Sequence, residues 1–280
     1  MNYTTLIDTQ SLEAHLDEPD LVIVDCRFDL MQPDAGRQEW QASHIPNARY
    51  AHLDHDLSSP VTPATGRHPL PDANTFIAWL ESRGIGNDSQ VVAYDATAGG
   101  YAVRLWWMLS RWLGHERVAV LDGGWQKWTQ EQRPIDAHVP TVTPARFEAR
   151  ADDSQWLGTP AIKSGVADGA IRLVDARTAE RFRGEAEPID PVAGHVPGAV
   201  NYPLQQNLGP DGCFLPADEL RRRYREFLGD IDSRNVIHMC GSGVTACHNL
   251  LAMDHAGLTG SRLYPGSWSE WIRTEKKPAE

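Results

Sequence analysis

The heptapeptide LVIVDCR at residues 21–27 returns as IRLVDAR at residues 171–177, and this repetition decides the fold. Three further segments recur in the same order: HIPNA (44–48) as HVPGA (195–199), VVAYD (91–95) as VIHMC (236–240), and LDGGW (121–125) as LYPGSW (263–268). The separations are 150, 151, 145 and, between the tryptophans, 143 residues. Four matched segments at a nearly constant separation indicate one unit written twice.

Each copy is about 140 residues long, which is enough to bury a core of its own and too long for a solenoid repeat. The length of 280 residues likewise predicts about two domains. The segment HVPTVTP (138–144) carries two prolines between the copies and suits an extended linker. We therefore predict one domain over residues 1–138, a linker over 139–154 and a second domain over 155–280.

Short β-branched runs alternate with helical patterns in each copy. Buried strands are predicted at residues 21–25, 90–94 and 117–121 in the first copy and at 173–175 and 235–239 in the second. Helices are predicted at residues 73–83, 101–113, 217–228 and 244–256, each followed by a glycine. This alternation predicts an α/β fold in which each copy is a mostly parallel sheet with helices on both faces.

Composition excludes several classes of protein. Apolar residues make up 41% of the chain, so it is not disordered. The sequence contains no run of about 18 apolar residues, and residues 1–20 lack the pattern of a secretory signal, so we expect neither a transmembrane helix nor a signal peptide. We also expect the four cysteines not to form a disulfide framework in a chain of this length. We expect a soluble, cytoplasmic protein. The net charge of −12 argues against nucleic acid as a partner, but a local site can still bind a small anion.

The candidate nucleophile is Cys240, in the segment CGSGVTA (240–246) between a predicted strand and a predicted helix. A cysteine there lies over the helix N-terminus, whose unpaired N–H groups stabilise a thiolate. The two glycines allow several N–H groups to converge on the sulfur, and Ser242 adds a hydroxyl. An ordinary buried cysteine is the alternative, but the environment favours a reactive thiolate.

The matching position of the first copy is Asp95, which cannot carry a transferable sulfur atom and is placed to cap a helix. Only the second copy is therefore expected to perform thiol chemistry. Cys26 is assigned to packing, and Cys213 is assigned no role. Cys247 lies seven residues after Cys240, so the two do not form a Cys-x-x-Cys redox pair.

With these motifs the whole chain resembles the tandem-domain rhodanese-like sulfurtransferases. The Cys-Gly-Ser-Gly-Val-Thr loop resembles that of 3-mercaptopyruvate sulfurtransferases, whereas thiosulfate sulfurtransferases usually carry basic residues after the cysteine. The resemblance implies that Cys240 takes a sulfur atom from 3-mercaptopyruvate as a persulfide. Cyanide, a small thiol or a thioredoxin-like protein then accepts this sulfur. It also implies that no metal or organic cofactor is needed, and the sequence contains no His-Glu-x-x-His or Cys-x-x-Cys metal motif.

The resemblance also implies roles for further residues. Arg181 matches an arginine that binds the donor's anionic group, whereas Arg183 suits a surface ion pair. Where such enzymes commonly carry a second substrate arginine, residues 187–191 read EPIDP. A family triad is matched by Ser242, His68 and Asp56, the last two from the first domain. The remaining predicted binding groups are loop backbone N–H donors: Gly241, Gly243, Val244 and Thr245.

Three alternatives remain open. Thiosulfate is the alternative donor, with sulfite as its product. A cysteine-dependent phosphatase needs an arginine six residues after the cysteine, where this chain has Ala246. A non-catalytic binding or sulfur-carrier module fits the first copy alone, but the Cys240 loop argues against it for the whole chain. A Trp-x-x-Trp pair in each copy is interpreted as structural.

Overall fold

The computed structural model describes residues 1–275, so the last five residues of the predicted second domain lie outside it. Contacts divide the chain into two compact units. Unit 1 comprises residues 1–59, 71–152 and 210–213, and unit 2 comprises residues 60–70, 153–209 and those from 214 onward. Residues 60–70 come from the first copy but make their contacts within unit 2, and residues 210–213 come from the second copy but make theirs within unit 1. The predicted boundaries, with a first domain over residues 1–138, a linker over 139–154 and a second domain over 155–280, stay a prediction.

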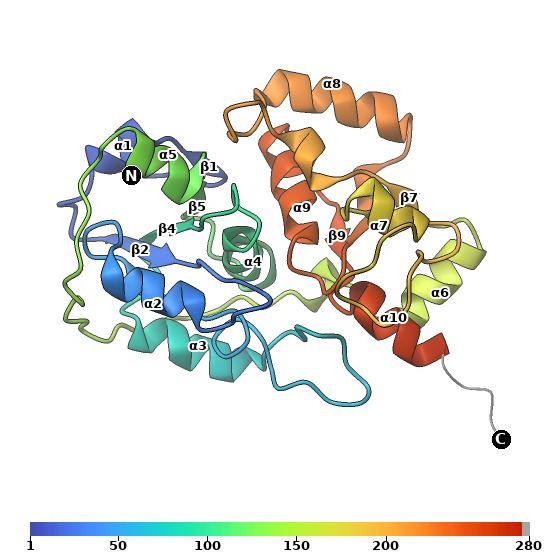
Figure 1. Ribbon diagram of the computed structural model, residues 1–280, viewed down its shortest axis with the longest axis horizontal. Coiled ribbons are helices and arrows are strands. Elements are labelled where there is room, and N and C mark those ends of the chain that lie inside the picture. Colours follow the sequence, from blue (N-terminus) through green and yellow to red (C-terminus); the bar gives the residue numbers. More distant parts are fainter. Residues whose placement is uncertain (276–280) are drawn as a thin grey trace. The chain divides into compact units, whose positions relative to one another are not determined.

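Unit 1 contains a five-stranded parallel sheet in the order β1-β5-β4-β2-β3 (Figure 1). Its strands are β1 (Leu6–Ile7), β2 (Leu21–Asp25), β3 (Arg49–Tyr50), β4 (Gln90–Tyr94) and β5 (Val118–Leu121). The central strands are buried on both faces, which is why they read as unbroken apolar runs in the sequence. Asp25 pairs with Tyr94, so β2 and β4 end level with each other.

Helices cover both faces of this sheet, as predicted. They are α1 (Thr9–Glu13), α2 (Ala35–Ala42), α3 (Ala73–Ser82), α4 (Ala102–Trp107) and α5 (Gly124–Gln130). Leu12 of α1 and Trp128 of α5 pack with Ile23 and Val92 into one apolar core. Figure 1 shows α3 on the opposite side of the sheet. The predicted helix over 101–113 is α4 continued by a π-helical turn, Met108–Trp112.

Unit 2 repeats this plan with four parallel strands in the order β7-β6-β8-β9. Its strands are β6 (Arg172–Asp175), β7 (Val200–Asn201), β8 (Val236–Met239) and β9 (Arg262–Leu263). Trp156 forms a single parallel bridge with Leu263, at the edge that β1 occupies in unit 1. The four-stranded sheet thus retains a trace of the fifth strand.

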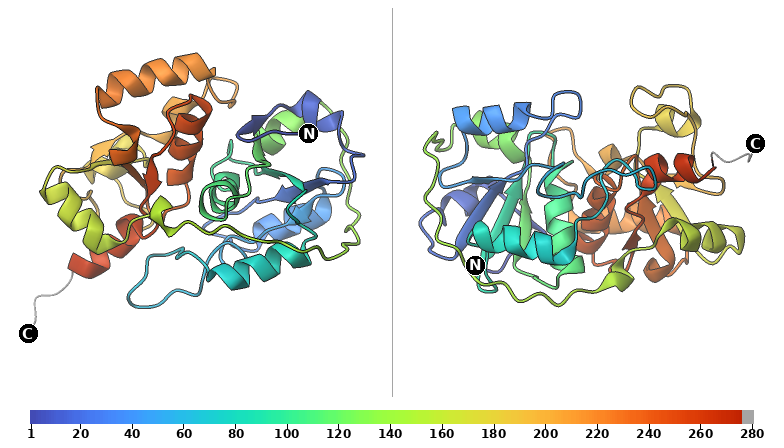
Figure 2. Two further views of the ribbon diagram at one scale, coloured as in Figure 1. Left: turned by 180° about the vertical axis from the view of Figure 1, so that it is seen from behind. Right: turned by 90° about the horizontal axis from the view of Figure 1, so that it is seen from below.

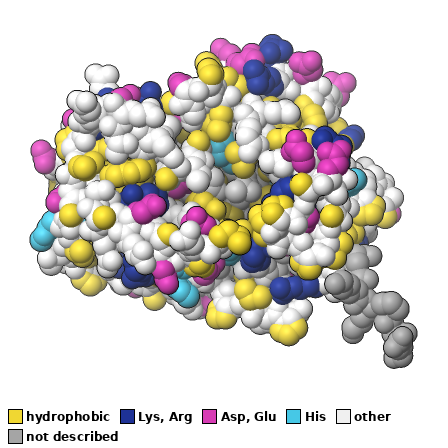
Figure 3. All heavy atoms as spheres, viewed as in Figure 1, with side chains coloured by type: hydrophobic (Ala, Val, Ile, Leu, Met, Phe, Trp, Pro, Cys, Tyr) yellow, Lys and Arg dark blue, Asp and Glu magenta, His cyan; other side chains and the backbone are white. Residues whose placement is uncertain are grey.

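The helices of unit 2 are α6 (Thr159–Ala167), α7 (Ala179–Arg183), α8 (Ala217–Leu228), α9 (Ala246–His255) and α10 (Ser267–Glu275). Single 3₁₀ turns occur at Asp153–Gln155, Leu204–Asn207 and Ser233–Asn235. Ile162 of α6 packs with Trp268 and Trp271 of α10 against one face of the sheet, while α9 contacts β8 and β9 and supports α8 (Figure 2). The outer surface of α8 is charged and interlaced with ion pairs such as that of Arg222 with Glu219 (Figure 3).

The sequence repeat is also a repeat of contacts. Arg27 Nη2 donates to Asp25 Oδ2 at 2.6 Å, and Arg177 Nη2 donates to Asp175 Oδ2 at 2.7 Å. Each guanidinium lies over the first tryptophan of its Trp-x-x-Trp pair, 4.3 and 5.1 Å from the ring centroid. The tryptophan pairs lie in the apolar cores or against them, as their structural interpretation requires.

The segment between the two copies has no helix or strand over residues 137–152. It runs along unit 1, where Phe147 is buried and Arg150 N–H donates to the carbonyl of Leu113. In the part of the chain that the structure describes, no helix has the length and apolar character needed to cross a membrane.

Candidate active site

Cys240 directly follows β8, which is paired on one side with β6 and on the other with β9. Its side chain is buried, and its backbone N–H donates to Ser267 Oγ at 3.1 Å. The thiol sulfur accepts the N–H of Gly243 at 3.2 Å. The sulfur therefore lies at the carboxyl edge of a parallel sheet, where such folds place ligand sites.

The Cys240 loop (residues 240–245) carries a set of open hydrogen-bond donors. Within residues 1–275, the backbone N–H groups of Gly241, Ser242, Val244 and Thr245 donate to no other group. Gly243 has φ of +75°, and a Cβ there would lie 2.3 Å from the carbonyl oxygen of Pro265. Only glycine fits this turn. Helix α9 begins at Ala246, two residues after the predicted start. The loop has the geometry of an anion site.

Unit 1 shows what the corresponding loop holds. The Asp95 carboxylate accepts the backbone N–H groups of Thr97, Gly99, Tyr101 and Ala102 at 2.6 to 3.0 Å. Asp95 thus fills its own loop and caps the start of α4, as predicted. The same position between strand and helix binds a carboxylate in one copy and presents a thiol among open donors in the other.

Helix α10 holds the Cys240 loop in place. The N–H groups of Trp268 and Ser269, in its first turn, donate to the carbonyls of Cys240 and Gly241 at 3.1 and 2.9 Å. In unit 1 the N–H of Trp125 donates to the carbonyl of Asp95 at 2.8 Å. The segments LDGGW and LYPGSW, the last pair of matched segments, therefore hold the loop between strand and helix in each copy.

His68 lies against the Cys240 loop, because its Nδ1 is 2.7 Å from Ser242 Oγ and both side chains are buried. The segment 60–70 reaches this position through unit 2. Arg273 donates to the carbonyls of Thr62 and Thr65, and a Cβ on Gly66 would lie 2.7 Å from the Gly266 carbonyl oxygen. The sequence assigned His68 to the first copy, whereas its contacts belong to unit 2.

Asp56, the third predicted triad residue, belongs to unit 1. Its Oδ2 accepts the backbone N–H of His52 at 2.7 Å, which closes a turn after β3. The structure therefore brings Ser242 and His68 together, and the role of Asp56 stays a prediction.

Arg181 lies on α7, with its side chain 16% exposed. It donates to Glu187 at 2.7 Å and to Asp190 at 3.2 Å, both in the stretch where the sequence lacks a second arginine. Arg67 donates to the same Asp190 carboxylate. Although burial alone would raise the pKa of Glu187, the bonds from Arg181 and from two backbone N–H groups hold this pKa below its usual value.

The sequence missed these partners for an identifiable reason. Arg67 and Asp190 both lie in loops, beside His68 and between prolines respectively. Neither loop has a periodic pattern or a motif that would mark these residues. Arg183 pairs with Glu185 on the exposed surface, which agrees with the expectation of a surface ion pair.

His238 of β8, two residues before Cys240, is a buried neutral group. Burial lowers its pKa to about 3, and its Nε2 lies 3.2 Å from Met253 Sδ. It therefore contributes no positive charge beneath the Cys240 loop at neutral pH.

The comparisons with known proteins agree with this geometry. The model of the rhodanese-like domain matches residues 8–131 and 159–274. The chain belongs to the rhodanese-like family. A Pseudomonas aeruginosa protein named "Probable 3-mercaptopyruvate sulfurtransferase" is 44% identical over 99% of this chain and 98% of its own. The thiosulfate sulfurtransferase of Gallus gallus is 35% identical over 84% of this chain and 81% of its own.

Among solved structures, 3-mercaptopyruvate sulfurtransferase from Leishmania major superposes with a TM-score of 0.85 at 30% identity, covering 98% of this chain and 76% of that one. The chain is thus a tandem rhodanese-like protein of the sulfurtransferase class, and its second domain carries Cys240.

The other cysteines of this rhodanese-like protein are free thiols, as expected for a chain without a disulfide framework. Burial raises the pKa of Cys213 to about 12 and raises that of Cys26 as well. Cys247 is buried in α9, with its sulfur 3.6 Å from the Gly243 carbonyl oxygen. Burial thus favours the protonated forms of Cys213 and Cys26, and protonated thiols are poor nucleophiles.

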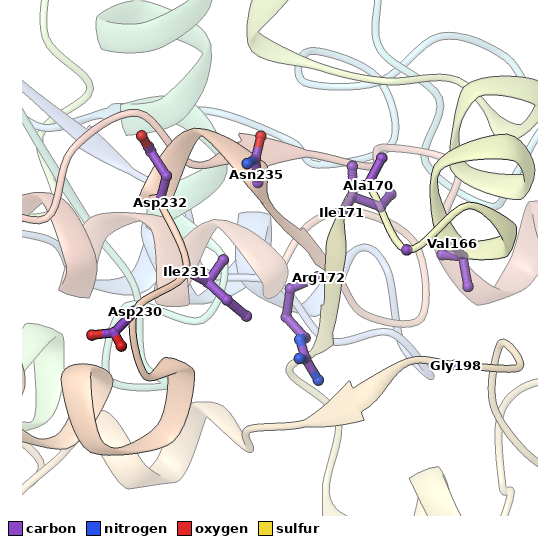
Figure 4. Close-up of a pocket in the computed structure, with 10 residues that line it drawn as sticks. Val166, Ala170, Ile171, Arg172, Gly198, Asp230, Ile231, Asp232 and Asn235 are labelled. Atoms are coloured by element: carbon purple, nitrogen blue, oxygen red, sulfur yellow. The ribbon is translucent and has the colours of Figure 1, made fainter.

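A cavity of about 610 Å³ lies at the opposite edge of the sheet of unit 2 (Figure 4). Ile171 and Arg172 at the start of β6 line it, with Asp230, Asp232 and Asn235 just before β8. Because Cys240 follows the carboxyl end of β8, this cavity is not part of the site around the Cys240 loop.

Proposed function

We propose that this chain transfers a sulfur atom from 3-mercaptopyruvate to a nucleophilic acceptor through a persulfide on Cys240. The observation that carries the proposal is the Cys240 thiol in a loop of open backbone N–H donors, which no other described group occupies. The relatives' names supply the donor, and the loop geometry supports the role of the cysteine.

In the first half-reaction, the Cys240 thiolate attacks the sulfur of 3-mercaptopyruvate. A sulfur–sulfur bond forms and the carbon–sulfur bond of the donor breaks, so the carbon keeps the electron pair as the enolate of pyruvate. A proton then reaches this carbon and yields pyruvate. The N–H groups of Gly241, Gly243, Val244 and Thr245 stabilise the negative charge of the thiolate and of the persulfide.

In the second half-reaction, cyanide or a thiol attacks the outer sulfur of the persulfide. The sulfur–sulfur bond breaks, and the electron pair returns to Cys240 as thiolate. We propose a small thiol, cyanide or a thioredoxin-like protein as acceptor and a cytoplasmic location. The expectations that the chain binds neither nucleic acid nor a membrane belong to the same proposal.

Two further groups serve the first half-reaction in this proposal. Arg181 binds the carboxylate of the donor, for which a guanidinium offers two parallel N–H donors. Ser242, paired with His68 Nδ1 at 2.7 Å, passes a proton toward the pyruvate enolate, and the imidazole restores the proton of the serine. Asp56 is proposed to orient His68.

Thiosulfate is the second candidate donor, because a relative of that name is 35% identical to this chain. Its outer sulfur is transferred in the same way, with the sulfur–sulfur bond of the donor broken and sulfite released. A guanidinium binds its anionic oxygens as well as it binds a carboxylate.

The test measures kcat/KM for pyruvate release from 3-mercaptopyruvate and for sulfite release from thiosulfate, with cyanide as acceptor in both. We expect 3-mercaptopyruvate to be preferred. Cys240→Ser should fold as the parent does and produce no thiocyanate, because serine cannot form a persulfide; Cys247→Ser is the matched control. Thiocyanate production by Cys240→Ser would contradict the mechanism, and a preference for thiosulfate would replace the donor.

A further inference from the structure

We propose that Arg67 is a second donor-binding guanidinium, which works beside Arg181 on the anionic end of the sulfur donor. This inference rests on the proposed function and extends it to a residue that lies more than one hundred positions away in the sequence. Two guanidinium groups, those of Arg67 and Arg181, lie at one glycine of the Cys240 loop.

The glycine is Gly241, directly after the nucleophile. A Cβ built on it would lie 3.0 Å from Arg67 Nη2 and 3.7 Å from Arg181 Nη2. Both nitrogens thus lie within 4 Å of one point beside the backbone of the loop, the position of this Cβ. The Asp190 carboxylate, 3.7 Å from the same point, accepts bonds from both guanidinium groups. Asp190 therefore holds the two arginines at the loop.

Arg67 keeps donors open after pairing with Asp190. A guanidinium has five N–H donors. Arg67 donates to Asp190 through Nη1. Among the described residues, Nε is buried without a partner, and Nη2 faces Gly241 without a hydrogen bond. Because Nη2 has no acceptor of its own, a carboxylate that reaches this nitrogen gains a charge-assisted hydrogen bond without breaking a native one.

The backbone at Arg67 is held by a hydrogen bond to helix α10. Its N–H donates to Ser269 Oγ at 3.0 Å, and the same Ser269 donates its own N–H to the carbonyl of Gly241. One residue of α10 thus sets both the Cys240 loop and Arg67. A cavity of about 230 Å³ adjoins Arg67, Asp190 and Ser269, and the Arg67 side chain is 24% exposed, so this guanidinium is not sealed inside unit 2.

The test compares Arg67→Ala with Arg183→Ala, which removes the same charge from an exposed pair on α7. For Arg67→Ala we expect kcat/KM for 3-mercaptopyruvate to fall about 10- to 100-fold, the effect of one charged hydrogen bond, mainly through KM. The rate at which cyanide discharges a preformed persulfide should stay unchanged. Equal effects of the two substitutions on donor KM would overturn the proposal.

A purely structural role for Arg67, as the counter-charge of Asp190, predicts a different result. Because Asp190 also pairs with Arg181, the matched reference for this test is Asp190→Asn alone. The double variant Arg67→Ala with Asp190→Asn differs from that reference only at Arg67, which then has no carboxylate charge to balance. We expect the double variant to have the higher donor KM, and equal KM values in the two variants would overturn the proposal. If the parent chain releases no pyruvate from 3-mercaptopyruvate, the donor assignment fails; the same variants are then compared with thiosulfate, for which an unchanged KM overturns the role of Arg67.

Discussion

Substitution of Gly243 by alanine should damage the Cys240 loop far more than the same substitution at another left-handed glycine. Gly243 has φ of +75°, and Gly169 at the end of α6 has φ of +66°. An alanine in the left-handed region costs about 1 kcal/mol at either position. A Cβ at Gly169 meets nothing within 4 Å, so this conformational cost is all that we expect there.

At Gly243 the new Cβ would lie 2.3 Å from the carbonyl oxygen of Pro265 and 2.6 Å from its Cα. Ordinary contact begins near 3.4 Å, so the loop must move by about an ångström. This movement breaks the bond from Gly243 N–H to Cys240 Sγ, which is worth about 1.5–3 kcal/mol when the sulfur is charged. We expect Gly243→Ala to lose about 3 kcal/mol of stability, against about 1 kcal/mol for Gly169→Ala.

The assays are urea denaturation for stability and single-turnover pyruvate release for persulfide formation. The rate of persulfide formation should fall about 100-fold in Gly243→Ala, as after removal of one donor from an oxyanion site, and should be unchanged in Gly169→Ala. Equal loss of stability in the two variants would show that Pro265 does not constrain the loop. An unchanged rate in Gly243→Ala would refute the role of the loop donors.

Three further results are expected. His68→Gln should lower kcat for pyruvate release at least 100-fold while cyanide still discharges the persulfide, because the pair with Ser242 serves only the first half-reaction; a parent-like kcat in a stopped-flow assay would exclude the relay. Burial lowers the pKa of His238 to about 3 in the folded protein, against 6.5 in the unfolded chain, so the parent loses stability as the pH falls below 6.5. Between pH 7 and pH 5, the free energy of unfolding of His238→Asn should therefore decrease by about 2 kcal/mol less than that of the parent. An equal decrease in the two proteins, measured by urea denaturation at each pH, would contradict this. Asp95→Ala should destabilise unit 1 by about 3 kcal/mol, since it leaves four N–H groups without an acceptor, yet Asp95→Ala should still form the Cys240 persulfide, which mass spectrometry detects.

The long elements of this fold could be predicted because their sequence patterns are strong. Strands β2 and β4 are buried on both faces and appear as unbroken apolar runs, and α8 agrees with its predicted limits of 217 and 228. Strands β1, β3, β7 and β9 contain two residues each, too few for any periodicity. Their pairing depends on the neighbouring strands rather than on their own side chains.

The candidate site divides in the same way. Cys240 was found because one sequence segment supplies the nucleophile, the turn and the helix start. Arg67 and Asp190 come from loops without a pattern, and Asp190 is a ligand of two arginines only after folding. The position of the segment 60–70 likewise depends on distant contacts, such as the fit of Gly66 against Gly266. The sequence repeat therefore predicts which strand ends form the site, but it does not predict which loops pack against those strand ends.

The inactivity predicted for the first copy follows from more than the exchange of cysteine for aspartate. Asp95 satisfies the donors that the Cys240 loop leaves open, so an anion from solution would have to compete with a covalently tethered carboxylate. At the repeat distance of 150 residues, the counterpart of Arg181 is Met31, an exposed apolar residue. The first copy therefore lacks both a cysteine at this position and a counterpart of Arg181, while it keeps the fold and the support of the loop through Trp125. Its loop has become a structural cap, which explains how two copies with the same contacts can differ in chemistry.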